Sequence, residues 1–138
     1  MSDLSLSDLA ARMADIDVAI LSTHGEGGAI ASRPMSNNGQ VDLDATSYYF
    51  TNERSGAATD IERDNTIALG FQGAGGFYLA VEGVAAIVRD KARFAEHWTP
   101  SLDAWFPEGQ DTPGVMMLEI EPARLHYWDG VEDGEITV

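Results

Sequence analysis

Two glycine-rich turns constrain the fold of this chain more than any other feature of its sequence. Residues 24–28 read His-Gly-Glu-Gly-Gly and residues 73–76 read Gly-Ala-Gly-Gly, and each turn lies between two strand-like apolar runs. Short turns of this composition return the chain as a hairpin, because glycine adopts the backbone conformations that tight turns require. The sequence therefore predicts antiparallel strand pairs.

The remaining pattern adds further strands and a few short helices. Strands are expected over residues 17–23, 29–35, 47–51, 66–72, 77–89, 115–120 and 125–128. Helices are expected from a cap at Ser5 or Ser7 through Asp15, over 57–63, and from a cap at Asp90 to about 98. The run over 77–89 exceeds the usual strand length of about 3–10 residues, so Gly83 is expected to mark a bend or bulge. There is no βαβ alternation and no internal repeat, which favours a mainly β fold with an antiparallel sheet that closes fully or partly.

The composition excludes several classes of partner and site. With 23 acidic and 8 basic residues, the formal charge is -15, which repels nucleic-acid phosphates and anionic membrane surfaces. The absence of cysteine excludes disulfides and zinc-cysteine sites. No apolar run approaches the ~20 residues that cross a bilayer, and the first residues lack the pattern of a signal peptide. We expect one cytoplasmic domain over 1–138, with an N-terminal helix within 1–16 and an acidic, solvated end over 129–138.

The segment Ser32-Arg33-Pro34-Met35 is the first candidate site, because it puts a charged side chain at the end of an apolar, strand-like run. Proline removes a backbone donor, so this strand must lie at a sheet edge or end here. A charge within a strand pattern usually has a partner, since burial without one is costly. An arginine beside such an edge can clamp an anion with two donors. The alternative is an ordinary exposed arginine on an edge strand.

The second candidate site is residues 51–56, which read Thr-Asn-Glu-Arg-Ser-Gly between an expected strand and an expected helix. Ser55 is expected to cap the helix, and the free amides that follow it form a cradle for an anion. Arg54 adds positive charge, and Gly56 allows a ligand to approach closely. The alternative is an ordinary capped turn.

A third segment concentrates large aromatic side chains, since Trp98, Trp105 and Phe106 lie in a stretch interrupted by prolines. Such residues in an irregular segment often cover a partner subunit or a flat ring. A hydrophobic plug for an open barrel end is the alternative interpretation, and the sequence leaves both open.

Several other kinds of site lack their sequence patterns. The three histidines, His24, His97 and His126, share no ligand spacing, so no metal site is expected. There is no Gly-x-Ser-x-Gly elbow and no Walker loop. The glycine turn at 73–76 joins two strands instead of opening a helix, so it is not a dinucleotide fingerprint. No catalytic residue is identified.

Several short motifs occur in a fixed order between about Leu9 and Asp129. They are Ser32-Arg33-Pro34-Met35, Tyr49-Phe50-Thr51, Ser55, Val81-x-Gly83, Trp98, Trp105-Phe106-Pro107-Glu108-Gly109 and Tyr127-Trp128-Asp129. This series resembles the general stress protein 26 branch of the pyridoxamine 5'-phosphate oxidase-like flavoproteins.

The resemblance implies a six-stranded antiparallel split β-barrel that forms a homodimer, with FMN held between the subunits. FAD is the second flavin it allows. By this analogy Ser32, Arg33 and Met35 would line the isoalloxazine ring, with Pro34 in the same cofactor site, and Phe50 and Thr51 would contribute mainly through their backbone. Ser55 would bind the phosphate, with Arg54 nearby, and Trp105 of the other subunit would cover the ring.

The chain departs from the family pattern at positions that usually carry positive charge. Ala57 and Ala31 stand where basic residues are common, and residues 80–83 read Ala-Val-Glu-Gly where Ser-Val-Ser-Gly is frequent. Fewer cations facing a phosphate of about two negative charges weaken its binding. Arg54 and Arg63 are candidates to replace the missing lysine in part. The sequence therefore predicts weaker or altered flavin binding, not its loss.

The function that this resemblance implies is that of a stress-related flavin-binding protein, with flavin-dependent hydride transfer to a small molecule as the expected enzyme chemistry. Two alternatives stay open. One is a non-catalytic protein that binds or senses flavin, and the other is a cofactor-free split barrel that acts through its dimer surface.

Overall fold

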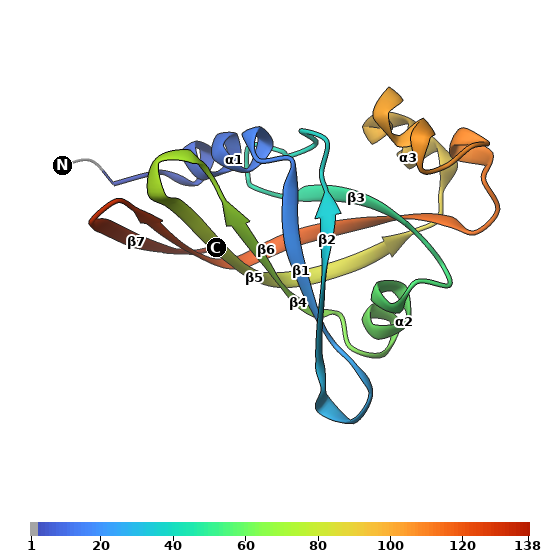
Figure 1. Ribbon diagram of the computed structural model, residues 1–138, viewed down its shortest axis with the longest axis horizontal. Coiled ribbons are helices and arrows are strands. Elements are labelled where there is room, and N and C mark those ends of the chain that lie inside the picture. The colour runs from blue at the N-terminus through green and yellow to red at the C-terminus, as the bar shows by residue number, and fades with distance from the viewer. Residues whose placement is uncertain (1–2) are drawn as a thin grey trace.

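The computed structural model, which describes residues 3–138, is an elongated, curled antiparallel sheet flanked by three short helices (Figure 1). The strands are β1 (Val18–His24), β2 (Ile30–Ser36), β3 (Ser47–Asn52), β4 (Thr66–Gln72), β5 (Phe77–Val88), β6 (Val115–Asp129) and β7 (Glu132–Thr137). The helices are α1 (Leu6–Asp15), α2 (Gly56–Arg63) and α3 (Lys91–His97). The expected elements are confirmed to within about two residues at each end. One difference is that the two strands expected near the C-terminus form a single strand, β6.

Six strands follow the spatial order β2-β1-β4-β5-β6-β3, and all their pairings are antiparallel. The path begins at β2 and ends at β3, and no ladder joins these two strands within the described part of the chain. The sheet is therefore a barrel that stays open along one seam, which confirms the predicted mainly β, six-stranded split β-barrel. Pro34 lies on the edge strand β2, where its missing N–H group breaks no inner ladder.

The acidic end of the chain, expected to be solvated over 129–138, is mostly exposed, but it also forms a strand that the sequence did not predict. Residues of β7 pair with β6 outside the six-strand path. Glu135 lies 2.7 Å from the guanidinium of Arg124, and Asp133 lies 2.9 Å from the imidazole of His126. Side chains of β6 thus pair with carboxylates of β7. The hydrogen bonds between the two strands order this end of the backbone.

The core lies inside the curl of the sheet and beneath α1 and α2. Its fully buried side chains come from alternate positions on the strands and from the inner faces of the helices. They include Leu9, Met13, Leu21, Tyr49, Leu69, Phe77, Leu79, Met116, Leu118 and Ile120. Ser5 caps α1, since its hydroxyl accepts from the amide of Asp8 while the Asp8 carboxylate accepts from the Ser5 amide. In residues 3–138 no helix has the length and apolar character that a membrane crossing requires.

A bulge bends the longest ladder, as the sequence predicts. The register between β5 and β6 shifts between Glu82 and Gly83, so that Glu82 pairs with Arg124 while Gly83 pairs with Pro122. The backbone carbonyl of Glu121 occupies the place that a Cβ at residue 83 would need. Only glycine allows the two strands to approach this closely, and the extra residue on β6 increases the local bend that curls the sheet.

Replacement of Gly83 by alanine tests this account of the bend. We expect Gly83→Ala to lower the free energy of unfolding by about 2–3 kcal/mol, because the new methyl group meets backbone atoms that cannot rotate away. Urea unfolding followed by far-UV circular dichroism measures the change. Gly25→Ala is the matched control, since a Cβ there has no neighbour closer than 3.6 Å. Equal stability of the two variants would contradict the account.

Candidate functional site

Arg33 lies on the edge strand β2 and points toward the inner side of the sheet, where its guanidinium has a defined set of partners. Its Nη1 donates to the hydroxyl of Thr23 at 2.7 Å, and its Nη2 lies 3.6 Å from Asp60 Oδ2. The side chain keeps 23% of its surface exposed. Arg33 is thus neither an ordinary surface arginine nor a free clamp, because its charge already has a partner.

Asp60 is that partner, and it is the only buried charged residue among those described. Its carboxylate accepts a hydrogen bond from Thr23 at 2.7 Å and lies 3.8 Å from the guanidinium of Arg63. These contacts join β1, β2 and α2 at one point. The sequence analysis missed Asp60 and Thr23. The available signal was the spacing on α2, since Asp60 follows Ala57 by three residues and so shares its buried face.

Ser55 caps α2, as predicted, because its hydroxyl oxygen accepts from the amide of Ala58 at 3.1 Å. The same oxygen accepts from the hydroxyl of Thr51 at 3.0 Å. The first amides of a helix have no acceptor inside the helix, and no oxygen within residues 3–138 accepts from the amides of Gly56 or Ala57. The amino end of α2 therefore presents two free amides and the hydroxyl of Ser55.

The fold brings Arg33 to this helix end. A Cβ built on Gly56 would lie 3.9 Å from Arg33 Nη2, in ordinary van der Waals contact. The guanidinium edge, the free amides of α2 and the Ser55 hydroxyl form one set of hydrogen-bond donors. This donor set matches the acceptor oxygens of a phosphate ester, so its chemistry fits such a group.

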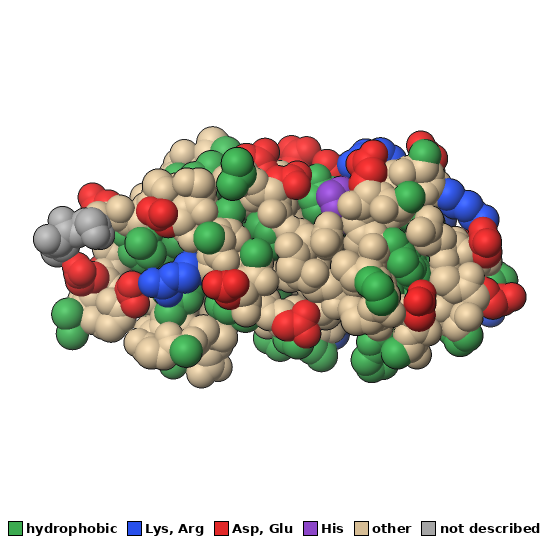
Figure 2. Space-filling view, turned by 90° about the horizontal axis from the view of Figure 1, so that it is seen from above, with side chains coloured by type: hydrophobic (Ala, Val, Ile, Leu, Met, Phe, Trp, Pro, Cys, Tyr) green, Lys and Arg blue, Asp and Glu red, His purple; other side chains and the backbone are tan. Residues whose placement is uncertain are grey.

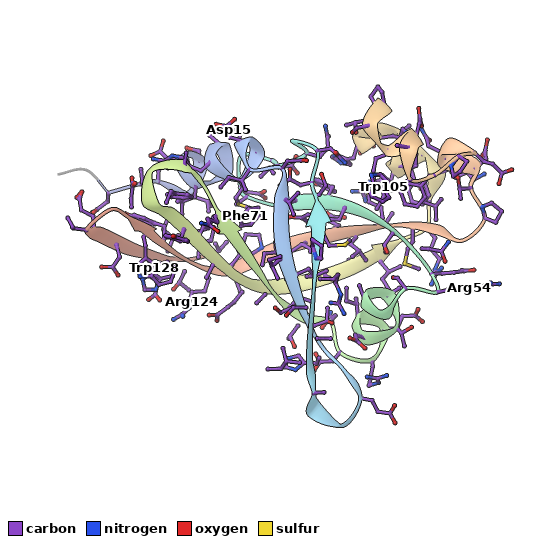
Figure 3. All side chains as sticks on the ribbon, in the orientation of Figure 1. Asp15, Arg54, Phe71, Trp105, Arg124 and Trp128 are labelled. Carbon is purple, nitrogen blue, oxygen red and sulfur yellow. The ribbon has the colours of Figure 1, made fainter. Side chains whose placement is uncertain are left out.

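Arg54 also lies at this end of the molecule, but its side chain extends into solvent (Figure 3). Among residues 3–138 its only hydrogen bond is made by the backbone amide, which donates to Asn52 Oδ1 at 2.9 Å. Within residues 3–138 its guanidinium makes no ion pair. Arg54 is therefore an exposed source of charge beside the donor set and not one of its hydrogen-bonded members.

The four residues of the Ser32-Arg33-Pro34-Met35 segment divide between the two faces of β2, because strand side chains alternate. Arg33 and Met35 face inward, and Met35 packs against the main core. Ser32 faces outward, where its hydroxyl lies 2.8 Å from that of Ser22. Pro34 is exposed opposite Ile20. The structure thus brings only Arg33 and Met35 of this segment to the inner face.

The aromatic residues of the third segment do not all lie in one place. The plug interpretation applies to some of them, and the interpretation as a cover for a partner or a ring stays open for the rest. Trp98 and Phe106 pack with Phe50, Phe94 and other residues in a second, smaller core. Trp98 meets the Phe50 ring edge to face, with 4.8 Å between centroids. Trp105, by contrast, has 79% of its surface exposed and extends beside α3 (Figure 3). Trp98 and Phe106 therefore act as a hydrophobic plug, whereas Trp105 is exposed and available to cover another surface.

Next to this second core, His97 lies flat on the ring of Tyr48, with centroids 3.5 Å apart. Its Nδ1 is 3.1 Å from Gln40 Oε1. Burial lowers the pKa of His97 below its ordinary value, and this effect outweighs the nearby carboxylates of Asp42 and Glu96, which act in the opposite direction. A charge at this helix end is therefore disfavoured, despite the favourable helix dipole.

No group of three or more potential metal ligands occurs in the described residues 3–138. The candidate site therefore consists of Arg33, Thr23, Asp60, Thr51, Ser55 and the first residues of α2.

Residues 5–138 match the family model described as "Pyridoxamine 5'-phosphate oxidase like". The chain belongs to this family. Its general stress protein 26 branch is supported by the match to General stress protein 26 of Bacillus subtilis, which is 30% identical over 97 residues and covers 67% of this chain and 69% of that protein. Protein bli-3 of Neurospora crassa is 27% identical over 139 residues, covering 91% of this chain. The chain spans 65% of the length of bli-3.

Solved structures agree on the fold. A protein related to general stress protein 26 from Clostridium acetobutylicum superposes with a TM-score of 0.82 at 18% identity, covering 99% of this chain and 97% of that one. The general stress FMN/FAD binding protein of Xanthomonas citri superposes with a TM-score of 0.77 at 18% identity, covering 96% and 94%. These likenesses show that the split β-barrel architecture is shared.

The environment of His97 predicts a pH-dependent stability. The unfolded chain takes up a proton at this residue near pH ~6.5, whereas the folded chain resists it to lower pH. Stability should therefore fall as the pH drops from about 7 toward 5, because the unfolded state binds the proton first.

Urea unfolding at several pH values measures this effect in wild type, in His97→Phe, which keeps the ring on Tyr48, and in His24→Gln, which removes an exposed histidine. We expect wild type and His24→Gln to lose more stability between pH 7 and 5 than His97→Phe loses. Parallel pH profiles for all three proteins would contradict the assignment.

Proposed function

We propose that this protein binds a flavin, FMN in the first place, at the open seam of the barrel. One observation carries the proposal: Arg33 on the edge strand meets the free amides and the Ser55 hydroxyl at the amino end of α2. Membership in the pyridoxamine 5'-phosphate oxidase-like family supports the choice of a flavin, as does the likeness to a protein described as FMN/FAD binding. The proposal includes a cytoplasmic, stress-related role.

Different residues of the candidate site would contact different parts of the flavin. Ser55 and the amides of Gly56 and Ala57 would hold the phosphate, with Arg33 and Arg54 beside it. FAD would extend the phosphate into a diphosphate at the same helix end. Phe50 and Thr51 would contact the flavin through their backbone, as Ser32 and Pro34 would from the edge strand.

The ring would lie toward Met35, on the same face of β2 as Arg33, beneath Trp105 of a second subunit. A bound flavin supplies hydride-transfer chemistry. The chain's own residues would orient it, donate hydrogen bonds and exclude water.

The proposal includes a homodimer, for which the outer face of the sheet offers an apolar surface. Val18, Ile20, Tyr78 and Trp128 lie on this face with 40–49% of their surface exposed, around the small residues Gly70 and Ala80. Trp128 extends from the side of the sheet opposite α1 (Figure 3). A contiguous apolar area of this kind is typical of a protein interface.

A non-catalytic role in binding or sensing flavin is the second candidate. The observation in its favour is that Asp60, the only buried carboxylate among residues 3–138, is already held by Thr23 and Arg33. It is therefore not a free proton acceptor. Oxidation of NADH or NADPH by the FMN-loaded protein would favour the oxidoreductase, and binding without turnover would favour the sensor.

Titration of FMN fluorescence with the purified protein tests the flavin site. We expect quenching at micromolar protein, and an affinity at least about tenfold lower for Arg33→Ala, because that variant removes donors and leaves the Asp60 carboxylate beside the phosphate with Arg63 as its remaining cationic partner. Arg124→Ala is the control, since it removes an equal charge from the other end of the molecule (Figure 3). Absence of quenching at high micromolar protein would contradict the flavin proposal. Unchanged affinity in Arg33→Ala would contradict this site.

Sedimentation equilibrium tests the dimer surface. We expect wild type to be a dimer and Ile20→Asp to weaken its association at least about tenfold, since a carboxylate would be buried in an apolar interface. Leu43→Asp introduces the same charge at a position that is 81% exposed elsewhere, and it should leave the dimer intact. A monomeric wild type, or equal association in both variants, would contradict the proposed surface.

A further inference from the structure

The carboxylate of Asp60 lies directly behind the guanidinium that faces the amino end of α2. It is 3.6 Å from Arg33 Nη2, and its side chain is only 12% exposed. Thr23 links the two groups, because its hydroxyl donates to Asp60 and accepts from Arg33, each at 2.7 Å. Arg33 is therefore fixed in position, and its charge is offset within the protein by a carboxylate that also lies 3.8 Å from the guanidinium of Arg63.

The charges around this helix end cancel. The segment 53–62 carries three carboxylates and one arginine, and Arg33 and Arg89 add two cations by pairing with that segment. Arg89 lies 3.4 Å from Glu53 and 3.8 Å from Glu62. Position 57, which follows the first free amide of the helix, is a buried alanine and contributes no charge.

The net negative charge of the whole molecule also disfavours the binding of an anion. The formal charge is -15, and Figure 2 shows acidic side chains spread over the face that carries α1 and α3, with few basic ones between them. A phosphate dianion approaching the site therefore meets hydrogen-bond donors but no net positive charge, in a surrounding potential that repels it.

We propose that Asp60 is a specificity-determining residue, which neutralises Arg33 so that the site recognises the flavin ring and its side chain while gaining little affinity from a terminal phosphate. Riboflavin is then bound about as tightly as FMN. This inference rests on the proposed flavin function and names the ligand class more closely. Asp60 acts through Arg33, so it is a positioning residue and not one that contacts the ligand.

Parallel fluorescence titrations with riboflavin and FMN test the inference at about 150 mM salt, where long-range charge effects are screened. For wild type we expect the two dissociation constants to agree within about threefold. In Asp60→Asn the amide oxygen can still accept from Thr23, but Arg33 gains an unbalanced charge. We expect this variant to bind FMN about tenfold more tightly than riboflavin.

Asp64→Asn is the matched control. It makes the same change in net charge at the carboxyl end of α2, at an exposed carboxylate that accepts from the amide and the hydroxyl of Thr66. We expect it to keep the wild-type ratio of the two affinities. If Asp60→Asn does not fold, the ratio in wild type still tests whether the phosphate adds affinity, and a large preference for FMN overturns the inference.

Three outcomes would overturn the inference. If wild type binds FMN more than about thirtyfold tighter than riboflavin, the flavin function stands but the neutralising role of Asp60 does not. If Asp60→Asn and Asp64→Asn show the same ratio, Asp60 does not set specificity. If neither flavin quenches, both the proposed function and this inference fail.

Discussion

The buried carboxylate of Asp60 joins three elements that lie far apart in the sequence. Through Thr23 it holds β1, through Arg33 it holds the edge strand β2, and its own backbone belongs to α2. Removing one partner of a buried ion pair is strongly destabilising, because the other charge is left without compensation. The same contact fixes the guanidinium of Arg33 at the amino end of α2. Stability and the geometry of the candidate site therefore depend on one interaction.

The topology of the sheet explains why the site lies where it does. The strand path ends at β2 on one side and at β3 on the other, so the barrel has an open seam. Arg33 comes from the first edge, while Thr51 and Ser55 come from the end of the second edge and the turn that follows it. The bulge at Gly83 bends the central ladder and so contributes to the curl that brings the two edges toward each other. Backbone geometry thus brings together donors that are 22 residues apart in the chain, as Arg33 and Ser55 are.

Local patterns in the sequence predicted most of the fold. Glycine turns, the caps at Ser5, Ser55 and Asp90, and the bulge at Gly83 depend on neighbouring residues, and the structure confirms them. Predictions that depended on distant partners were less successful. The end over 129–138 was expected to be solvated and is mostly exposed, but its pairing with β6 was not predicted, because local sequence does not show the partner strand. Arg33 was expected to have a partner, but the sequence did not identify Asp60, which lies 27 residues away. Side chains alternate between the two faces of β2, so Ser32 and Pro34 lie on the opposite face from Arg33. A motif of four consecutive residues does not show this separation.

The central claim is that a flavin binds where Arg33 meets the amino end of α2. Nitrogen-15 NMR of the full chain, recorded as FMN is added, tests it most directly. The account predicts that the amide signals of Gly56 and Ala57 shift more than those of other residues, because these two free amides receive the ligand, and that they shift less in Arg33→Ala at the same subsaturating FMN concentration. Flavin binding with unperturbed Gly56 and Ala57 signals and large shifts elsewhere would contradict the account.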